Sequence, residues 1–257
     1  MPNVLHNALT SADLHPPGAH THPDSDLSSH VQLDARYYQR ALVDAALAGK
    51  QDDLLHEAHR YTRRIAADAI SPRFQIPKDS LPIYGFPTRI SPEHQAEPGR
   101  TLGRWGDDAW GDRAALGKRN GVFDNDLIEA AASFISLRWR PSFSPTWVTG
   151  VPTRRYPHLV PELARKLAGL LALPYVDAIA KIRDTAQQNA QENSVHQCRN
   201  LDGSFEIVGV PNAGPVLLVD DLVDSGWSFT ILAMLLRRAG SGPVLPFALA
   251  TTRARDD

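Results

Sequence analysis

The stretch that decides the fold is Val216-Leu-Leu-Val-Asp-Asp-Leu-Val-Asp-Ser-Gly-Trp-Ser228. Its first four residues are all apolar, which is typical of a strand that protein covers on both faces. We expect this strand to end at Asp220 and Asp221, because adjacent acids repel each other and neither enters a core unpaired. The residues that follow lead into a helix that begins near Ser228.

The segment after the two acids has the composition of a phosphate-binding loop. Gly226 permits a positive φ and lets a ligand approach the backbone. Ser225 and Ser228 supply hydroxyls, and the first N–H groups of the next helix have no partner within that helix. Carboxylates at a strand end can accept hydrogen bonds from sugar hydroxyls, directly or through a divalent cation. Together these features predict a ribose 5-phosphate site; the alternative is an ordinary strand-to-helix turn with a serine cap.

Strands and helices alternate on both sides of this stretch. Apolar runs and helical periodicity predict strands at 147–151, 175–182, 216–219 and 244–250, and helices at 127–135, 159–171 and 228–238. Such alternation requires crossover connections. We therefore expect an α/β fold, an open parallel sheet with helices on both faces, whose ligands bind at the carboxyl ends of the strands.

The N-terminal part differs in composition from the rest. Residues 1–30 are rich in His, Pro, Ser and Asp, which predicts a flexible tail. Residues 31–99 form a helical N-terminal region and a linker, and residues 100–257 form the α/β domain. Many prolines and glycines within 72–112 indicate extended segments and loops.

Bulk composition limits the function classes. A net charge of -2 gives no general attraction to nucleic acid or to an anionic membrane. No apolar run is long enough to cross a bilayer, and no signal peptide is evident at the first residues. The single cysteine, Cys198, excludes an intramolecular disulfide and favours a reducing, cytoplasmic compartment.

The stretch 216–228 resembles the signature of type I phosphoribosyltransferases, in which two acids precede a Thr-Gly-x-Thr loop. The resemblance implies that Asp220 and Asp221 bind the ribose hydroxyls of phosphoribosyl pyrophosphate and a Mg²⁺ ion. It also implies a 5-phosphate site, for which the candidate residues are Asp224, Ser225, Gly226, Trp227 and Ser228. Serine replaces threonine at both positions here, and Trp227 stands where a small residue is usual, so we expect it to reshape the pocket.

Upstream motifs are similar to the ComF branch of this family. Arg183-Asp-Thr185, Gln188 and Arg199-Asn-Leu-Asp-Gly-Ser-Phe205 carry that likeness. The position of the pyrophosphate loop falls at Val151, and the substrate-binding candidates there are Pro152, Thr153, Arg154 and Arg155. The polar segment 183–203 is interpreted as a loop that closes over the reacting centre, with Arg199 as its catalytic candidate.

The sequence also resembles the phosphoribosyltransferase-like C-terminal region of some bacterial RecQ-type helicases. Trp105-Gly-Asp107, Val151-Pro-Thr-Arg-Arg-Tyr-Pro157, Gln191-Glu-Asn-Ser194 and Arg237-Arg-Ala-Gly240 carry this likeness, and no G-x-x-x-x-G-K-[ST] motor loop occurs. Two functions stay open: a magnesium-dependent phosphoribosyltransferase, or a non-catalytic module that senses phosphoribosyl pyrophosphate or a nucleotide and serves DNA uptake or repair. The family resemblance favours a homodimer, and the second function implies a DNA-processing partner.

Overall fold

The structure is a computed structural model that describes residues 68–107, 110–183 and 194–252. The tail predicted at 1–30 and the first part, residues 31–67, of the helical region and linker predicted at 31–99 lie outside these residues. No helix in the described ranges is both long and apolar enough to cross a membrane.

A five-stranded sheet forms the centre of the described chain, in the order β1-β2-β7-β6-β3. The strands are β1 (Ala69–Ile70), β2 (Gly99–Arg104), β3 (Trp147–Gly150), β6 (Val216–Val223) and β7 (Val244–Thr251). Four of them run parallel, and only the short edge strand β1 is antiparallel to its neighbour. This topology confirms the predicted α/β class.

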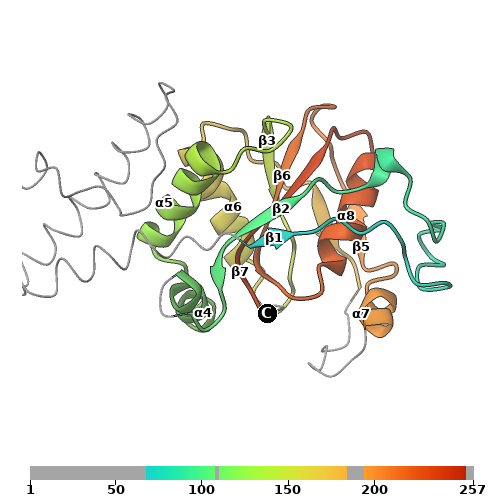
Figure 1. The fold of residues 1–257 in the computed structure, drawn as a ribbon, viewed down its shortest axis with the longest axis horizontal. Helices are drawn as coiled ribbons and strands as arrows, with labels where there is room; N and C mark the ends of the chain where they lie inside the picture. Colours follow the sequence, from blue (N-terminus) through green and yellow to red (C-terminus); the bar gives the residue numbers. More distant parts are fainter. Residues whose placement is uncertain (1–67, 108–109, 184–193, 253–257) are drawn as a thin grey trace, which may run out of the picture.

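Helices cover both faces of the sheet, as predicted (Figure 1). Helix α8 (Trp227–Arg238) covers one face, and the other is covered by α4 (Trp110–Asn120), α5 (Asn125–Ser133) and α6 (Leu159–Leu170). Alternate residues of β6 serve the two cores: Val216 and Leu218 pack on the α8 side, whereas Leu217 and Val219 pack on the other. All four side chains are fully buried.

Strand β6 corrects one prediction that matters for the site. The strand does not end at the two acids but continues to Val223, and Asp220 and Leu222 stay in register with Ala248 and Ala250 of β7. The sheet tolerates the acids because they lie near its carboxyl edge, where Asp220 keeps some solvent contact and Asp221 has a cationic partner. The acid pair is therefore held by rigid backbone and not by a loop.

Two further predictions were wrong in detail. The strand predicted at 175–182 is short, β4 (Ile179–Lys181), and it pairs with β5 (Phe205–Ile207) in a separate antiparallel sheet. Part of the loop predicted at 183–203 is a helix, α7 (Ser194–Asn200), while residues 184–193 lie outside the described chain. Cys198 and Leu201 anchor this region because both are buried in the core on the α8 side.

Helix α4 was not predicted, because glycines interrupt its sequence pattern. These glycines permit close packing: a Cβ on Gly111 would lie 1.4 Å from the carbonyl oxygen of Arg104 in β2. The Asp107 carboxylate accepts hydrogen bonds from the N–H groups of Gly111 at 2.7 Å and Arg104 at 2.8 Å. The Trp105-Gly-Asp107 motif thus joins the end of β2 to the start of α4.

The proline-rich segment before β2 contributes to the same core. Ile70, Ile76, Leu81 and Ile90 are buried together with α8 and the sheet. The segment runs beside α8 (Figure 1), and its short helix η2 (Pro92–His94) contacts α8. In the structure these side chains share the core of the domain predicted for residues 100–257.

Candidate phosphoribosyl site

Residues 224–228, the predicted phosphate-binding segment and hereafter called the phosphate loop, join the carboxyl end of β6 to the start of α8. Gly226 is the N-cap of α8 and has a φ of 77°, in the left-handed region that glycine adopts without strain. No atom lies within 4 Å of the position that a Cβ would occupy there. The predicted conformation at Gly226 is confirmed, and the N–H groups of the first helical turn begin directly after it.

The acid pair has a cationic partner that the sequence did not reveal. Lys118 of α4 places its Nζ 3.0 Å from both carboxylate oxygens of Asp221. The Asp221 side chain is only 8% exposed, so a carboxylate without this ammonium group would be costly to bury. The two residues are 103 positions apart in the chain, and no local pattern indicates their contact.

Asp220 differs from Asp221 in its environment. Burial raises the pKa of the Asp220 carboxyl well above its ordinary value of 3.8, and the neighbouring negative charge of Asp221 raises it further. A hydrogen bond from the Asp221 N–H to Asp220 Oδ1, 2.8 Å long, acts in the opposite direction. Asp220 therefore takes up a proton more readily than an ordinary aspartate does.

The segment Pro152–Arg155, here called the arginine loop, follows β3. Because β3 and β6 are parallel neighbours, their carboxyl ends meet at one edge of the sheet, and the Val151 N–H donates to the carbonyl of Val219 at 2.8 Å. Arg154 Nη2 donates to the carbonyl of Ile182 at 3.0 Å, and the Arg155 guanidinium lies 5.4 Å from the Tyr156 ring. Both arginines are exposed, and Pro152 and Thr153 are half-buried.

Trp227 does not border an opening as its bulk suggested. Its side chain is 2% exposed and belongs to the core on the α8 side. The Arg73 guanidinium lies over the indole, 4.0 Å from its ring centroid. The Trp227 side chain is thus part of the core, and its expected influence on the pocket stays a prediction.

The Asp224 carboxylate is held by two other segments. Thr252 Oγ1 donates to Asp224 Oδ1 at 2.8 Å, and Gln197 Nε2 of α7 lies 3.5 Å from Oδ2. Gln197 is buried, whereas Arg199 on the same helix is exposed. The structure brings Gln197 to the phosphate loop; the catalytic role of Arg199 stays a prediction.

The motif Arg199–Phe205 contacts the proline-rich segment through Asp202 and Gly203. The Asp202 carboxylate accepts hydrogen bonds from the N–H groups of Ile83 at 2.9 Å and Tyr84 at 3.2 Å. Gly203 has a φ of 64°, and a Cβ there would lie 2.9 Å from the Ile83 side chain. The motif therefore fastens the proline-rich segment against α7 and β5.

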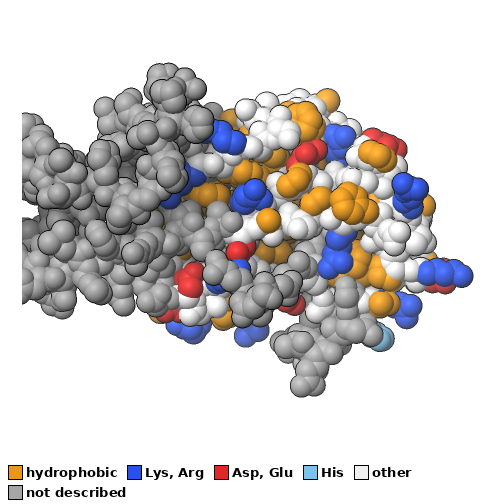
Figure 2. Space-filling view, viewed as in Figure 1, with side chains coloured by type: hydrophobic (Ala, Val, Ile, Leu, Met, Phe, Trp, Pro, Cys, Tyr) orange, Lys and Arg blue, Asp and Glu red, His pale blue; other side chains and the backbone are white. Residues whose placement is uncertain are grey.

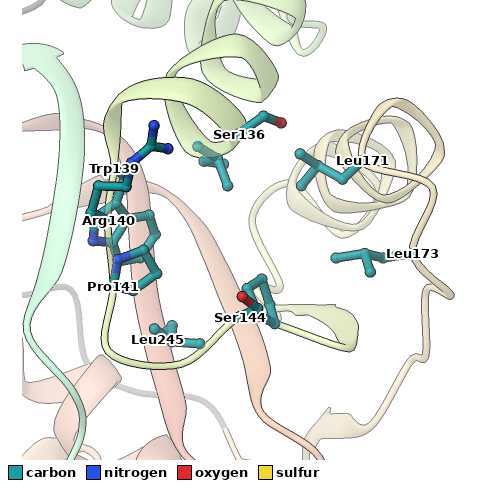
Figure 3. A pocket seen from close by; sticks show the side chains of 10 residues that line it. Ser136, Trp139, Arg140, Pro141, Ser144, Leu171, Leu173 and Leu245 are labelled. Atoms are coloured by element: carbon teal, nitrogen blue, oxygen red, sulfur yellow. The ribbon is translucent and has the colours of Figure 1, made fainter. Parts of the chain in front are cut away.

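A separate pocket of about 290 Å³ lies at the opposite, amino-terminal edge of the sheet (Figure 3). Ile135 and Ser136 of the π-helical turn η3 (Phe134–Arg138) line one side, and Leu171 and Leu173 line another. Leu245, near the start of β7, forms part of the floor. None of the residues that line this pocket belongs to the phosphate loop or the arginine loop.

No family model matches the chain, and no curated protein matches it. Similar solved structures include the allosteric regulatory enzyme of purine biosynthesis, with 21% identity, a TM-score of 0.34, and coverage of 46% of this chain and 24% of that one. The chain therefore spans about a quarter of that enzyme's length.

Two similar structures are adenine phosphoribosyltransferases. The one from Leishmania tarentolae has 16% identity and a TM-score of 0.33, and the match covers 50% of this chain and 72% of that chain. The one from Leishmania donovani has the same identity and TM-score, and the match covers 50% and 54%.

Proposed function

We propose that this chain binds phosphoribosyl pyrophosphate and transfers its phosphoribosyl group to a nitrogenous acceptor, with release of pyrophosphate. One observation carries the proposal: an acid pair on β6 is followed, after residues 222–225, by a left-handed Gly226 at the start of α8, at the edge where the parallel strands end. This arrangement suits a ribose 5-phosphate, because hydroxyls need acceptors and a phosphate needs N–H donors.

The phosphate loop and the arginine loop bind different parts of the proposed substrate. The first N–H groups of α8, with the Ser225 and Ser228 hydroxyls, bind the 5-phosphate. Asp220 accepts hydrogen bonds from the ribose hydroxyls, since it is the acid that Lys118 leaves available. The arginine loop contacts the diphosphate, whose negative charge grows as it leaves, and Arg154 and Arg155 are its exposed cations.

The residues fit a Mg²⁺ ion only in part. Among the described residues, no three His, Cys, Asp or Glu side chains gather as a protein metal site requires. Lys118 engages both oxygens of Asp221, so Asp220 is the carboxylate suited to the ion, with substrate oxygens as further ligands. The chemistry that Mg²⁺ supplies when bound is Lewis-acid stabilisation of the departing diphosphate.

The reaction replaces one bond at the sugar C1 with another. The C1–O bond to pyrophosphate breaks and its electron pair leaves with the diphosphate, while an acceptor nitrogen forms the new C1–N bond and loses its proton to solvent. The residues of this chain hold the 5-phosphate and the ribose hydroxyls at fixed positions, which aligns C1 with the acceptor. The rigid backbone of β6 supports this alignment.

A calorimetric titration of phosphoribosyl pyrophosphate with Mg²⁺ tests the proposal. The wild type should bind it, and Asp220→Asn should lose most of the affinity. Asp112→Asn is a matched control, because Asp112 is an exposed aspartate in the first turn of α4 and does not belong to the acid pair or the phosphate loop. An absence of binding to the wild type, or equal binding by Asp220→Asn, would contradict the proposal.

A second candidate function is the non-catalytic sensor. The ion pair between Lys118 and Asp221 favours it, because only one acid of the pair, Asp220, then remains to bind a metal-bound substrate. Release of pyrophosphate with a panel of bases separates the two functions: turnover supports the enzyme, and binding without turnover supports the sensor.

Figure 2 shows Lys and Arg side chains scattered over the described part of one face, not gathered in a patch. A DNA-processing partner and a homodimer stay predictions.

A further inference from the structure

Arg73 contacts the phosphate loop from a distant part of the chain. It lies between β1 and β2, is half-buried, and is 152 positions from Ser225, whose carbonyl oxygen accepts a hydrogen bond from Arg73 Nη2 at 2.6 Å. The same guanidinium lies 4.0 Å from the centroid of the Trp227 ring. Arg73 therefore contacts the residues on both sides of Gly226.

The planarity of the peptide group gives these contacts a direction. The carbonyl of Ser225 and the N–H of Gly226 belong to one planar unit, and in a trans peptide they point to opposite sides. Because the carbonyl points to Arg73, the Gly226 N–H points away from Arg73. The buried Trp227 ring also contacts Arg73, so this N–H is turned to the side opposite the Arg73–Trp227 contact.

A charged donor on the carbonyl also changes the N–H. Hydrogen bonds along one peptide unit polarise each other, so a guanidinium on the Ser225 carbonyl makes the Gly226 N–H a stronger donor. Arginine is suited to this position because one planar group donates a hydrogen bond and stacks on an indole at the same time. The charge of Arg73 also reaches α7, where it lowers the otherwise raised pKa of the Cys198 thiol.

We propose that Arg73 is a positioning residue of the phosphate loop, which orients and polarises the Gly226 N–H for a phosphate of the ligand. The inference rests on the proposed function, and it assigns a part of the phosphate site to the proline-rich segment. Arg73 acts from behind the loop and does not touch the phosphate.

The test compares ribose 5-phosphate binding by four proteins: wild type, Arg73→Met, Arg73→Lys and Arg238→Met. Arg238 is a matched control, because it donates to a carbonyl of the same proline-rich segment, Tyr84, at 2.8 Å and lies 4.2 Å from the Phe86 ring. Arg73→Met should weaken binding by about tenfold or more. Arg73→Lys should recover part of this loss, and Arg238→Met should bind like the wild type.

The NMR chemical shift of the Gly226 amide proton gives a second measurement. A general loosening of the proline-rich segment would not change how this chemical shift responds to the ligand. Ribose 5-phosphate should shift this proton downfield in the wild type and less in Arg73→Met, with Arg73→Lys between them. If Arg73→Met does not fold, the comparison of Arg73→Lys with Arg238→Met decides by the same criteria.

The outcomes separate this inference from the proposed function. A wild type that binds no ribose 5-phosphate refutes the proposed function. A wild type that binds, with Arg73→Met within about twofold of it, refutes the role of Arg73 alone. An equal loss in Arg238→Met also refutes it, because the effect then comes from the attachment of the whole segment.

Discussion

Lys118 Nζ lies 3.0 Å from each carboxylate oxygen of Asp221 and joins α4 to the carboxyl end of β6. The carboxylate is almost fully buried, while the lysine keeps about a third of its side-chain surface in solvent. The pair neutralises one of the two adjacent acids. An anionic ligand that approaches the phosphate loop therefore meets less negative charge than the sequence Asp220-Asp221 suggests.

Replacing Lys118 with Met should lower the free energy of unfolding by about 1–3 kcal/mol, because the buried Asp221 carboxylate loses its cation. Chemical denaturation measures the change. In the double variant Lys118→Met/Asp221→Asn the loss should be smaller than the sum of the single losses. Additive losses would show that the two side chains do not interact.

Gly226→Ala should cost about 1 kcal/mol of stability, because an L residue is strained at a φ of 77° although space for a Cβ is open. Gly240→Ala is the matched control: its φ is 99°, its Cβ position is also open, and it lies past the other end of α8. Both variants should lose stability in denaturation, but only Gly226→Ala should lose affinity for ribose 5-phosphate. Equal affinity in the two variants would argue against a phosphate site at Gly226.

Asp220→Asn should change how stability depends on pH. The pKa of Asp220 is raised in the folded state, so the folded protein binds this proton more tightly than the unfolded chain does. Asp220 therefore destabilises the wild type as the pH rises from its unfolded pKa through the folded one. Thermal melts should show the variant to be more stable at neutral pH, with the advantage shrinking towards about pH 4. A constant difference between the two melts would contradict the raised pKa.

Cys198 should react slowly with thiol reagents at neutral pH. Its side chain is fully buried, and burial raises the pKa of the thiol from 9.0 to about 12. Thiolate formation in the unfolded chain then lowers stability as the pH rises above about 9, since the folded thiol keeps its proton. Because it is the only cysteine, labelling with a chromogenic disulfide reports the opening of α7 directly. Labelling as fast as in denaturant would contradict the burial.

The sequence predicts the parts of this fold that local patterns determine. The apolar run of β6, the periodicity of α6 and α8 and the strand β7 all lie close to where the patterns placed them. Gly226 was identified for the same reason, because a positive φ at a helix start is a local requirement. The class of the fold then follows from the order of these elements.

The missed features depend on distant partners. The acids were expected to end β6, but pairing with β7 and the ammonium group of Lys118 keep the strand intact to Val223. The glycines of α4 hid a helix, since only the approach to Arg104 explains why Gly111 is needed. Trp227 was placed at the ligand for lack of any sign that the core and Arg73 enclose it. A single sequence gives no information on such contacts.

The position of β7 between β2 and β6 has a consequence for the synthesis of the protein. All eight residues of this strand are buried, yet the ribosome adds them after every other strand of the sheet. Until residue 251 emerges, β2 and β6 have no common neighbour, and the carboxyl edge that carries the phosphate loop cannot form. The nascent chain therefore exposes one unpaired edge of β2 and one of β6 until β7 has been made, and unpaired strand edges of this kind are prone to aggregate.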